Sequence, residues 1–88
     1  MSIMDAMREK LACLAPTDLM IVDDSAKHVG HAGAREGGHF TLNIVAVAFA
    51  GKSRLENQRL VFSLIGDLKD AGIHALSVTA RAPEKLPL

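Results

Sequence analysis

The segment HFTLNIVAVAF, residues 39–49, is rich in β-branched and aromatic residues, which favour an extended strand over a helix. One face of that strand would present Phe40, Leu42, Ile44, Ala46 and Ala48. The opposite face would present Val45, Val47 and Phe49, so we expect part of the strand to be covered on both sides. The chain is therefore predicted to fold around one long central strand.

Two further strands are predicted. Residues 19–22 are short and apolar and are followed by Asp23, Asp24 and Ser25, which indicates a strand that ends in a turn. Residues 73–80 alternate apolar and small polar side chains and predict the last strand, with Leu76, Val78 and Ala80 on one face. The connection over residues 24–38 is long enough to indicate a function.

Two helical regions complete the pattern. Met4, Met7 and Leu11 recur at the spacing of one helix face and predict a helix over residues 2–14, which Pro16 stops. A capping box at Ser53-Arg54-Leu55-Glu56 predicts the start of a second helical region. Its apolar stripe covers residues 60–68, Gly66 weakens it, and Gly72 is the expected stop.

Charge and composition exclude several classes of protein. The 88 residues make one domain, and ten basic residues balance ten acidic ones, so no long-range field draws the molecule to nucleic acid or an anionic membrane. No apolar run reaches eighteen residues and no secretory signal pattern is present, so we expect an intracellular, cytoplasmic protein. The single cysteine, Cys13, is expected to be buried and inert. No nucleophile stands beside a recognisable base, which makes an enzyme the least favoured class.

Histidine is the residue type that most suggests a site. His28, His31 and His39 fall in one segment with four of the seven glycines. Neutral imidazole binds zinc, copper and iron, and glycine lets a loop bend towards a metal. A closed structural zinc site is disfavoured, because the only cysteine is in the first helix. His39 is interpreted as the structural start of the central strand, and His74, which has the parity of Leu76, is expected from the pattern to be buried.

A second candidate site is cationic. Lys52, Arg54 and Arg59 surround the start of the second helical region, where a helix N-terminus itself favours phosphate. The three side chains also fit a solvated helix face, and only three aromatic residues are available in the chain to stack on bases. A nucleic-acid patch is therefore kept as an alternative.

Taken together, five blocks resemble the BolA family over roughly residues 3–80. They are Val22-Asp23-Asp24-Ser25 followed by His28, His39-Phe40, Phe49-x-Gly51-Lys52, Arg59-Leu60-Val61-Phe62 and Ile73-His74-Ala75-Leu76. The resemblance implies an α+β protein of order α-β-β-α-α-β, similar to a type II KH domain, with a three-stranded sheet and helices on one face. A BolA-like domain would cover residues 1–82, and residues 83–88 would form a flexible tail.

The resemblance also implies a function. Members of the family are non-enzymatic partners of monothiol glutaredoxins of the CGFS type, with which they share a two-iron, two-sulfur cluster that the isolated chain does not bind. His74 matches the family's ligand on the last strand, and His28 or His31 supplies the loop ligand, with His28 the closer match. Glutaredoxin cysteine and glutathione would bind the other iron. Mixed histidine and thiolate ligation has a precedent in Rieske centres.

Some bacterial members of the family are described as DNA-binding transcriptional regulators of cell shape and stress responses, which corresponds to the cationic alternative. One departure bears on that role. The family commonly has Arg-His-Arg at the start of its main helix, whereas this chain has Asn57-Gln58-Arg59. Glutamine neither titrates near neutral pH nor ligates iron well, so no role of that helical histidine is carried over.

Overall fold

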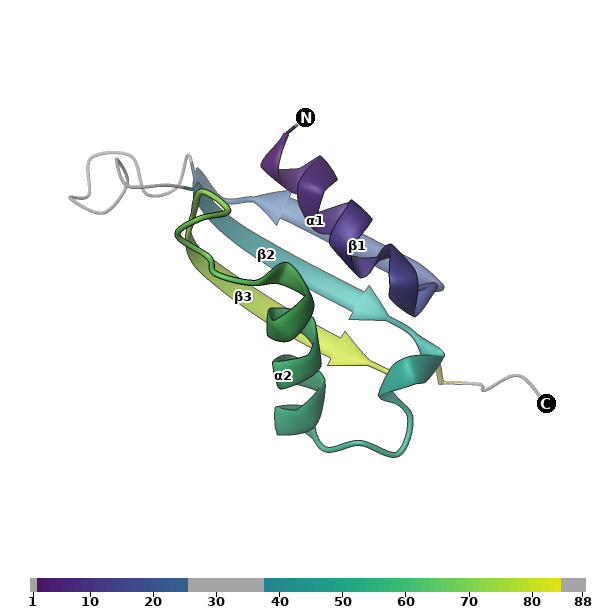
Figure 1. The fold of residues 1–88 in the computed structure, drawn as a ribbon. Helices are drawn as coiled ribbons and strands as arrows, with labels where there is room; N and C mark the ends of the chain where they lie inside the picture. The colour runs from purple at the N-terminus through teal and green to yellow at the C-terminus, as the bar shows by residue number, and fades with distance from the viewer. Residues whose placement is uncertain (1, 26–37, 85–88) are drawn as a thin grey trace.

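The computed structural model describes residues 2–25 and 38–84, and Figure 1 shows three strands side by side with two helices against one face of the sheet. The elements in chain order are helix α1 (Ile3–Leu11), a 3-10 helix (Ala12–Leu14), β1 (Asp18–Asp23), β2 (Gly38–Val45), a second 3-10 helix (Val47–Phe49), α2 (Arg54–Ile65) and β3 (Ile73–Arg81). This confirms the predicted α+β class, with the helical region between β2 and β3 split into a short turn and a longer helix.

The sheet has the order β1-β2-β3 and is mixed. Strands β1 and β2 are antiparallel, with Asp18 opposite Val45 and Asp23 opposite Phe40. Strands β2 and β3 are parallel, which requires the chain to cross back over the sheet, and α2 makes that crossing. The predicted first and last strands are both confirmed, each slightly longer than the sequence indicated.

The hydrophobic core lies between one face of the sheet and the two helices. Phe40, Leu42 and Ile44 point into it from β2, as their alternation predicted. Met7 and Leu11 of α1 and Val61 and Ile65 of α2 close it from the other side. The opposite face of the sheet is open, and Met20 and Val22 of β1 are exposed there.

The prediction that part of the central strand is buried on both faces is wrong. Strand β2 ends at Val45, and the chain turns into the 3-10 helix at Val47 in order to leave the sheet for the crossing to α2. Val47 is therefore 46% exposed. Phe49 is buried because that turn, rather than a strand, carries it back towards the core.

Helix α1 follows the predicted stripe. Its N-cap is Ser2, whose hydroxyl accepts a hydrogen bond of 3.0 Å from the backbone N–H of Asp5. Met7 and Leu11 are buried, but Cys13 is exposed, which contradicts its predicted burial. Two residues beyond Leu11 the helical turn has moved the side chain to the far side of the helix, so Cys13 lies off the buried stripe.

Helix α2 begins where the capping box predicts. Ser53 and Glu56 exchange two hydrogen bonds of 3.1 Å between side chain and backbone N–H. The helix ends earlier than predicted, because Gly66 adopts φ 83° and its N–H donates to Phe62 O. Gly66 is therefore the cap and not a weak interior position, and Gly72 belongs to the turn before β3.

The helices are tied to each other at their ends. Lys10 Nζ of α1 donates a hydrogen bond of 2.9 Å to Ile65 O, the carbonyl at the last residue of α2. A cation at a helix C-terminus also offsets the partial negative charge there. In the part of the chain that is described, neither helix is long and apolar enough to cross a membrane. The domain boundary predicted at residue 82 stays a prediction, since residues 85–88 lie outside that part.

Candidate functional site

The topology gathers three strand ends at one end of the sheet. Strand β1 ends there because it is antiparallel to β2, and β2 and β3 both begin there because they are parallel. The connection that carries His28 and His31 leaves this end after Ser25 and returns to it at Gly38. Both histidines lie outside the described residues, so their positions stay predictions. We call this region the histidine end of the sheet (Figure 1).

The turn after β1 holds the start of β2 in place. Ser25 Oγ accepts a hydrogen bond of 3.0 Å from the backbone N–H of His39. The backbone N–H of Asp24 donates to His39 O at 2.7 Å, and the Thr41 hydroxyl donates to the Asp24 carboxylate. Both backbone groups of His39 are thus bonded to this turn. The interpretation of His39 as the structural start of β2 is confirmed for its backbone.

Asp23 stabilises the same turn. Its carboxylate accepts a hydrogen bond of 2.9 Å from the backbone N–H of Ser25. The Ser25 side chain, and after it that backbone N–H, lower the pKa of Asp23 below its usual value, because both favour the ionised form. The three residues of the Asp23-Asp24-Ser25 turn therefore each bind a different group at the histidine end.

Gly38 is required by a close approach of side chain to backbone. A Cβ atom at this position would stand 2.3 Å from Cε2 and 2.8 Å from Cζ of Phe40, and 3.3 Å from Ser25 Oγ. Phe40 is only 6% exposed, so its ring belongs to the packed core. The Gly38 N–H also donates to Gly72 O at 3.0 Å, which joins the start of β2 to the turn before β3.

His74 is exposed because β3 contains an irregularity at its start. Gly38 pairs with Ile73, but the next residue, His39, pairs with Ala75, so His74 is the extra residue of a β-bulge. Ile73 is buried, His74 and Ala75 are both exposed, and Leu76 returns to the helix-covered face. The predicted burial of His74 is wrong, since strict alternation does not hold across the bulge.

The bulge places His74 against His39. The centroids of the two imidazole rings are 4.9 Å apart, with 43° between the ring planes. Thirty-five positions separate the two residues in the sequence, which gave no signal of this contact. Only the parallel pairing of β2 with β3 and the bulge bring them together.

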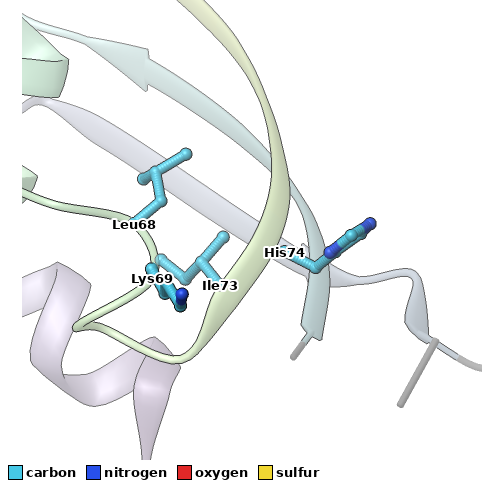
Figure 2. Close-up of a pocket in the computed structure, with 4 residues that line it drawn as sticks. All are labelled: Leu68, Lys69, Ile73 and His74. Carbon is cyan, nitrogen blue, oxygen red and sulfur yellow. The ribbon is translucent and has the colours of Figure 1, made fainter. Parts of the chain in front are cut away.

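Two hollows flank this pair. One, of about 560 Å³, is lined by Leu68, Lys69, Ile73 and His74; Figure 2 shows the His74 ring pointing away from the other three side chains, across β3. The second is smaller and is lined by Asp24, His39, Phe40, Thr41, Ala75 and Ser77. His74 is thus reachable from outside the molecule, as a ligand shared with another protein must be.

The described residues provide an incomplete set of metal ligands. Over residues 2–25 and 38–84, no three histidine, cysteine, aspartate or glutamate side chains gather closely enough to hold a metal ion. Imidazole nevertheless suits iron, and an exposed imidazole fits a cluster whose other ligands come from elsewhere. The donor set of this end therefore fits a shared metal group better than an enclosed one.

The cationic candidate lies elsewhere. Lys52, Arg54 and Arg59 are all exposed around the start of α2, which follows the far end of β2 (Figure 1). Glu56 lies among them, and its pKa is lowered by hydrogen bonds from the backbone and side chain of Ser53 and further by the positive charges of Lys52 and Arg59. An ionised carboxylate in the middle of the cations weakens the patch as a phosphate site.

Gln58 has a structural role where the related helix commonly has histidine. Its Nε2 donates a hydrogen bond of 2.5 Å to Val78 O in β3, which is an edge strand. The neighbouring Asn57 is buried, with 6% of its surface exposed. At Gln58 the departure thus joins α2 to β3 by a hydrogen bond rather than presenting a titrating group, whereas the buried Oδ1 of Asn57 has no hydrogen-bond partner among the described residues.

Comparisons with known proteins agree on one family. A family model described as BolA-like protein matches residues 11–85. The chain is 40% identical over 86 residues to "Protein BOLA1, chloroplastic" of Arabidopsis thaliana, covering 92% of this chain and 54% of that protein. It is 40% identical over 87 residues to "SufE-like protein 1, chloroplastic/mitochondrial" of the same plant, covering 91% of this chain and 24% of the relative.

A bacterial relative is more distant. The "DNA-binding transcriptional regulator BolA" of Escherichia coli is 32% identical over 79 residues, which cover 89% of this chain and 73% of the regulator. Among solved structures, BolA1 from Arabidopsis thaliana superimposes with a TM-score of 0.80 at 34% identity and 99% coverage of both chains. The chain spans only about half and about a quarter of the two plant relatives, 54% and 24% of their lengths.

Proposed function

The chain belongs to the BolA-like family, and from that premise we propose that it is a non-enzymatic adaptor in iron–sulfur trafficking and iron homeostasis. It binds a monothiol glutaredoxin of the CGFS type and contributes histidine ligands to a two-iron, two-sulfur cluster that bridges the two proteins. The glutaredoxin cysteine and glutathione provide the thiolates. The observation that carries the proposal is the exposure of His74 at the bulge, beside the end of the sheet to which the histidine-bearing connection returns.

The roles of the chain's own residues follow from their places. His74 presents an imidazole nitrogen to the partner's side from a strand whose position the sheet holds. His28 or His31 provides the second imidazole from the connection between Ser25 and Gly38, the ends of which are anchored at the same end of the sheet. When bound, the cluster supplies a group that can be passed on or exchange electrons, with a potential that histidine ligation raises.

The occurrence of a similar domain inside a longer protein also supports an adaptor. The SufE-like relative carries a similar stretch within a protein about four times as long, since the match covers 24% of it. A solved structure described as the BolA domain of SufE1 has a TM-score of 0.73 with this chain at 45% identity. A domain that is found inside a longer protein is suited to working against another protein unit.

The test is anaerobic reconstitution of the cluster on the chain mixed with a CGFS glutaredoxin and glutathione, followed by visible circular dichroism. The mixture is expected to give a spectrum different from that of glutaredoxin alone, because imidazole replaces part of the thiolate ligation. His74→Ala should abolish this difference. Thr79→Ala, an exposed position on the same strand, is the matched control and should preserve it. A His74→Ala spectrum identical to that of the unaltered chain would refute the assignment.

The alternative is a DNA-binding transcriptional regulator that uses Lys52, Arg54 and Arg59. The name of the Escherichia coli relative supports it, together with the position of the three cations at a helix N-terminus. The neutral charge of the chain and the presence of Glu56 among the cations argue against it. The adaptor is therefore the leading proposal.

A further inference from the structure

The contact between His39 and His74 brings the two ring centres as close together as those of two rings that bind one metal ion. Histidine binds zinc at about 2.0–2.1 Å, which puts the centre of the ring about 3.2 Å from the metal. Two rings on one tetrahedral ion then have centres about 5.2 Å apart. The observed separation of 4.9 Å is close to that value without any movement of the backbone.

The backbone positions of both rings are already set. His39 is held by hydrogen bonds from both its N–H and its C=O to the turn after β1, and His74 occupies the bulge at the start of the paired strand. Sites on strands place ligands more accurately than sites on loops. The exposed His74 ring can adjust its own torsion angles to bring one nitrogen to an ion beside His39.

The surroundings on this side of the sheet favour a cation. The Asp24 carboxylate, which accepts from Thr41, lines the same hollow as His39 and adds negative charge there. Lys69 lines the other hollow, and Figure 2 shows its side chain on the far side of β3 from the His74 ring. The charge on the His39 side is thus of the sign that a metal ion needs, and the cation that lines the His74 hollow points away from the His74 ring.

We infer that His39 and His74 together form a binding site for a divalent late transition-metal ion, Zn²⁺ or Cu²⁺, on the isolated chain. Each ring gives one nitrogen to the ion and keeps the other for a hydrogen bond, as metal-binding histidines do. Water or a small ligand fills the remaining positions. Cu²⁺ binds more tightly than Zn²⁺ at such a nitrogen site. The site is assigned to the chain without a partner, so it goes beyond the proposed adaptor function and stands independently of it.

The experiment is a Zn²⁺ titration of the full chain followed by NMR of the imidazole nitrogens, with affinity from calorimetry. Saturation should shift ring signals of both His39 and His74 in the unaltered protein. His39→Ala and His74→Ala should each weaken Zn²⁺ binding by roughly 10- to 100-fold or more. Removing a group that only hydrogen-bonds to a metal ligand already costs that much, and these residues are the ligands themselves. The double variant His28→Ala/His31→Ala tests the two loop histidines as rival ligands. Thr79→Ala, an exposed position on β3, is the matched control and should leave the affinity unchanged.

The outcomes separate this inference from the proposed function. Zn²⁺ shifts at His74 without His39, or loss of binding in the loop double variant but not in His39→Ala, would overturn the histidine pair. The NMR measurement on the unaltered chain decides the question even if His39→Ala fails to fold. Neither result bears on the visible spectrum of the complex with glutaredoxin, which tests the adaptor proposal separately.

Discussion

The histidine end of the sheet and the cationic start of α2 are built on the same device and yet present their side chains differently. At each region a serine hydroxyl and an acidic side chain accept hydrogen bonds from backbone N–H groups. The pair is Ser25 and Asp23 at the histidine end, and Ser53 and Glu56 at the start of α2. At the histidine end, two imidazole rings from different strands lie with their centroids 4.9 Å apart. At the start of α2, three long cations extend into solvent around an acid.

The cost of ordering these side chains explains why the histidine end is the better candidate for a site. An imidazole on a strand has few torsion angles to order when it binds a ligand, whereas lysine and arginine lose about 1.5–2 kcal/mol of side-chain conformational freedom each when held. Exposed ion pairs recover only about 0–1 kcal/mol. A similar backbone device therefore produces a preorganised pair at one place and a solvated face at the other.

The largest expected effect comes from breaking the histidine end at Gly38. Gly38→Ala puts a methyl group 2.3 Å from the buried Phe40 ring, and we expect it to lower the free energy of unfolding by about 1–3 kcal/mol, as overpacking does. Urea unfolding followed by circular dichroism measures the change. The movement of β2 should also shift the NMR signals of His39.

Gly51→Ala is the comparison at the other region. Gly51 has φ 74°, so the substitution brings backbone strain, but no atom lies within 4 Å of the added Cβ. The loss should stay near the roughly 1 kcal/mol expected of strain in the left-handed region. Equal losses for the two variants would show that the contact with Phe40 contributes nothing and that the histidine end is looser than described.

A smaller effect is expected at the cationic region. A gel-shift titration with duplex DNA should give the same curve for the unaltered chain and for Arg54→Ala/Arg59→Ala, because zero net charge and Glu56 offset the cations. Should the double variant instead weaken binding and reduce the log–log salt slope by about one per lost phosphate contact, function would belong to this region. Lys69→Ala, a cation outside the patch, is the control.

The smallest effects are on pH dependence. Because the folded pKa values of Asp23 and Glu56 are lowered, each acid adds stability that is present above its unfolded pKa and lost as the pH falls through its folded pKa. Ser25→Ala should raise the pKa of Asp23 towards its usual 3.8 and leave Glu56 unchanged. Ser53→Ala should raise the pKa of Glu56 towards 4.5 and leave Asp23 unchanged.

Carboxyl ¹³C chemical shifts over an acid titration measure both values. A simultaneous rise of both pKa values in either serine variant would mean that the substitution loosens the whole fold. Such a result would contradict the assignment of each pKa shift to a local hydrogen bond. Separate responses would confirm that the two turns act independently, as expected of groups at different places on the molecule.

Local signals predicted much of the fold. The capping box placed the start of α2, and the alternation of Phe40, Leu42 and Ile44 identified the buried face of β2. Both signals depend on residues within a few positions of one another. The family blocks were equally informative, because the turn after β1 and the start of β2 that they mark are the parts that bond to each other.

The errors occurred where an element ends or changes direction. The sequence did not reveal that β2 stops at Val45, that Gly66 takes a positive φ, or that Cys13 has moved off the buried stripe. Apolar residues continue past Val45 and Cys13, and Leu68 extends the apolar stripe beyond Gly66. The end of an element depends on where the chain must go next, which is a property of the crossing between parallel strands and of the packed helices.

The candidate site divides in the same way. Local patterns were enough to predict three strands, two helical regions and a histidine-rich connection, because periodicity, caps and turn residues act within a few positions. The exposure of His74 and its contact with His39 arise from strand pairing and could not be predicted from local patterns. A one-residue bulge inverts which face a strand residue occupies, and pairing of distant strands sets which rings meet; neither leaves a mark in local sequence.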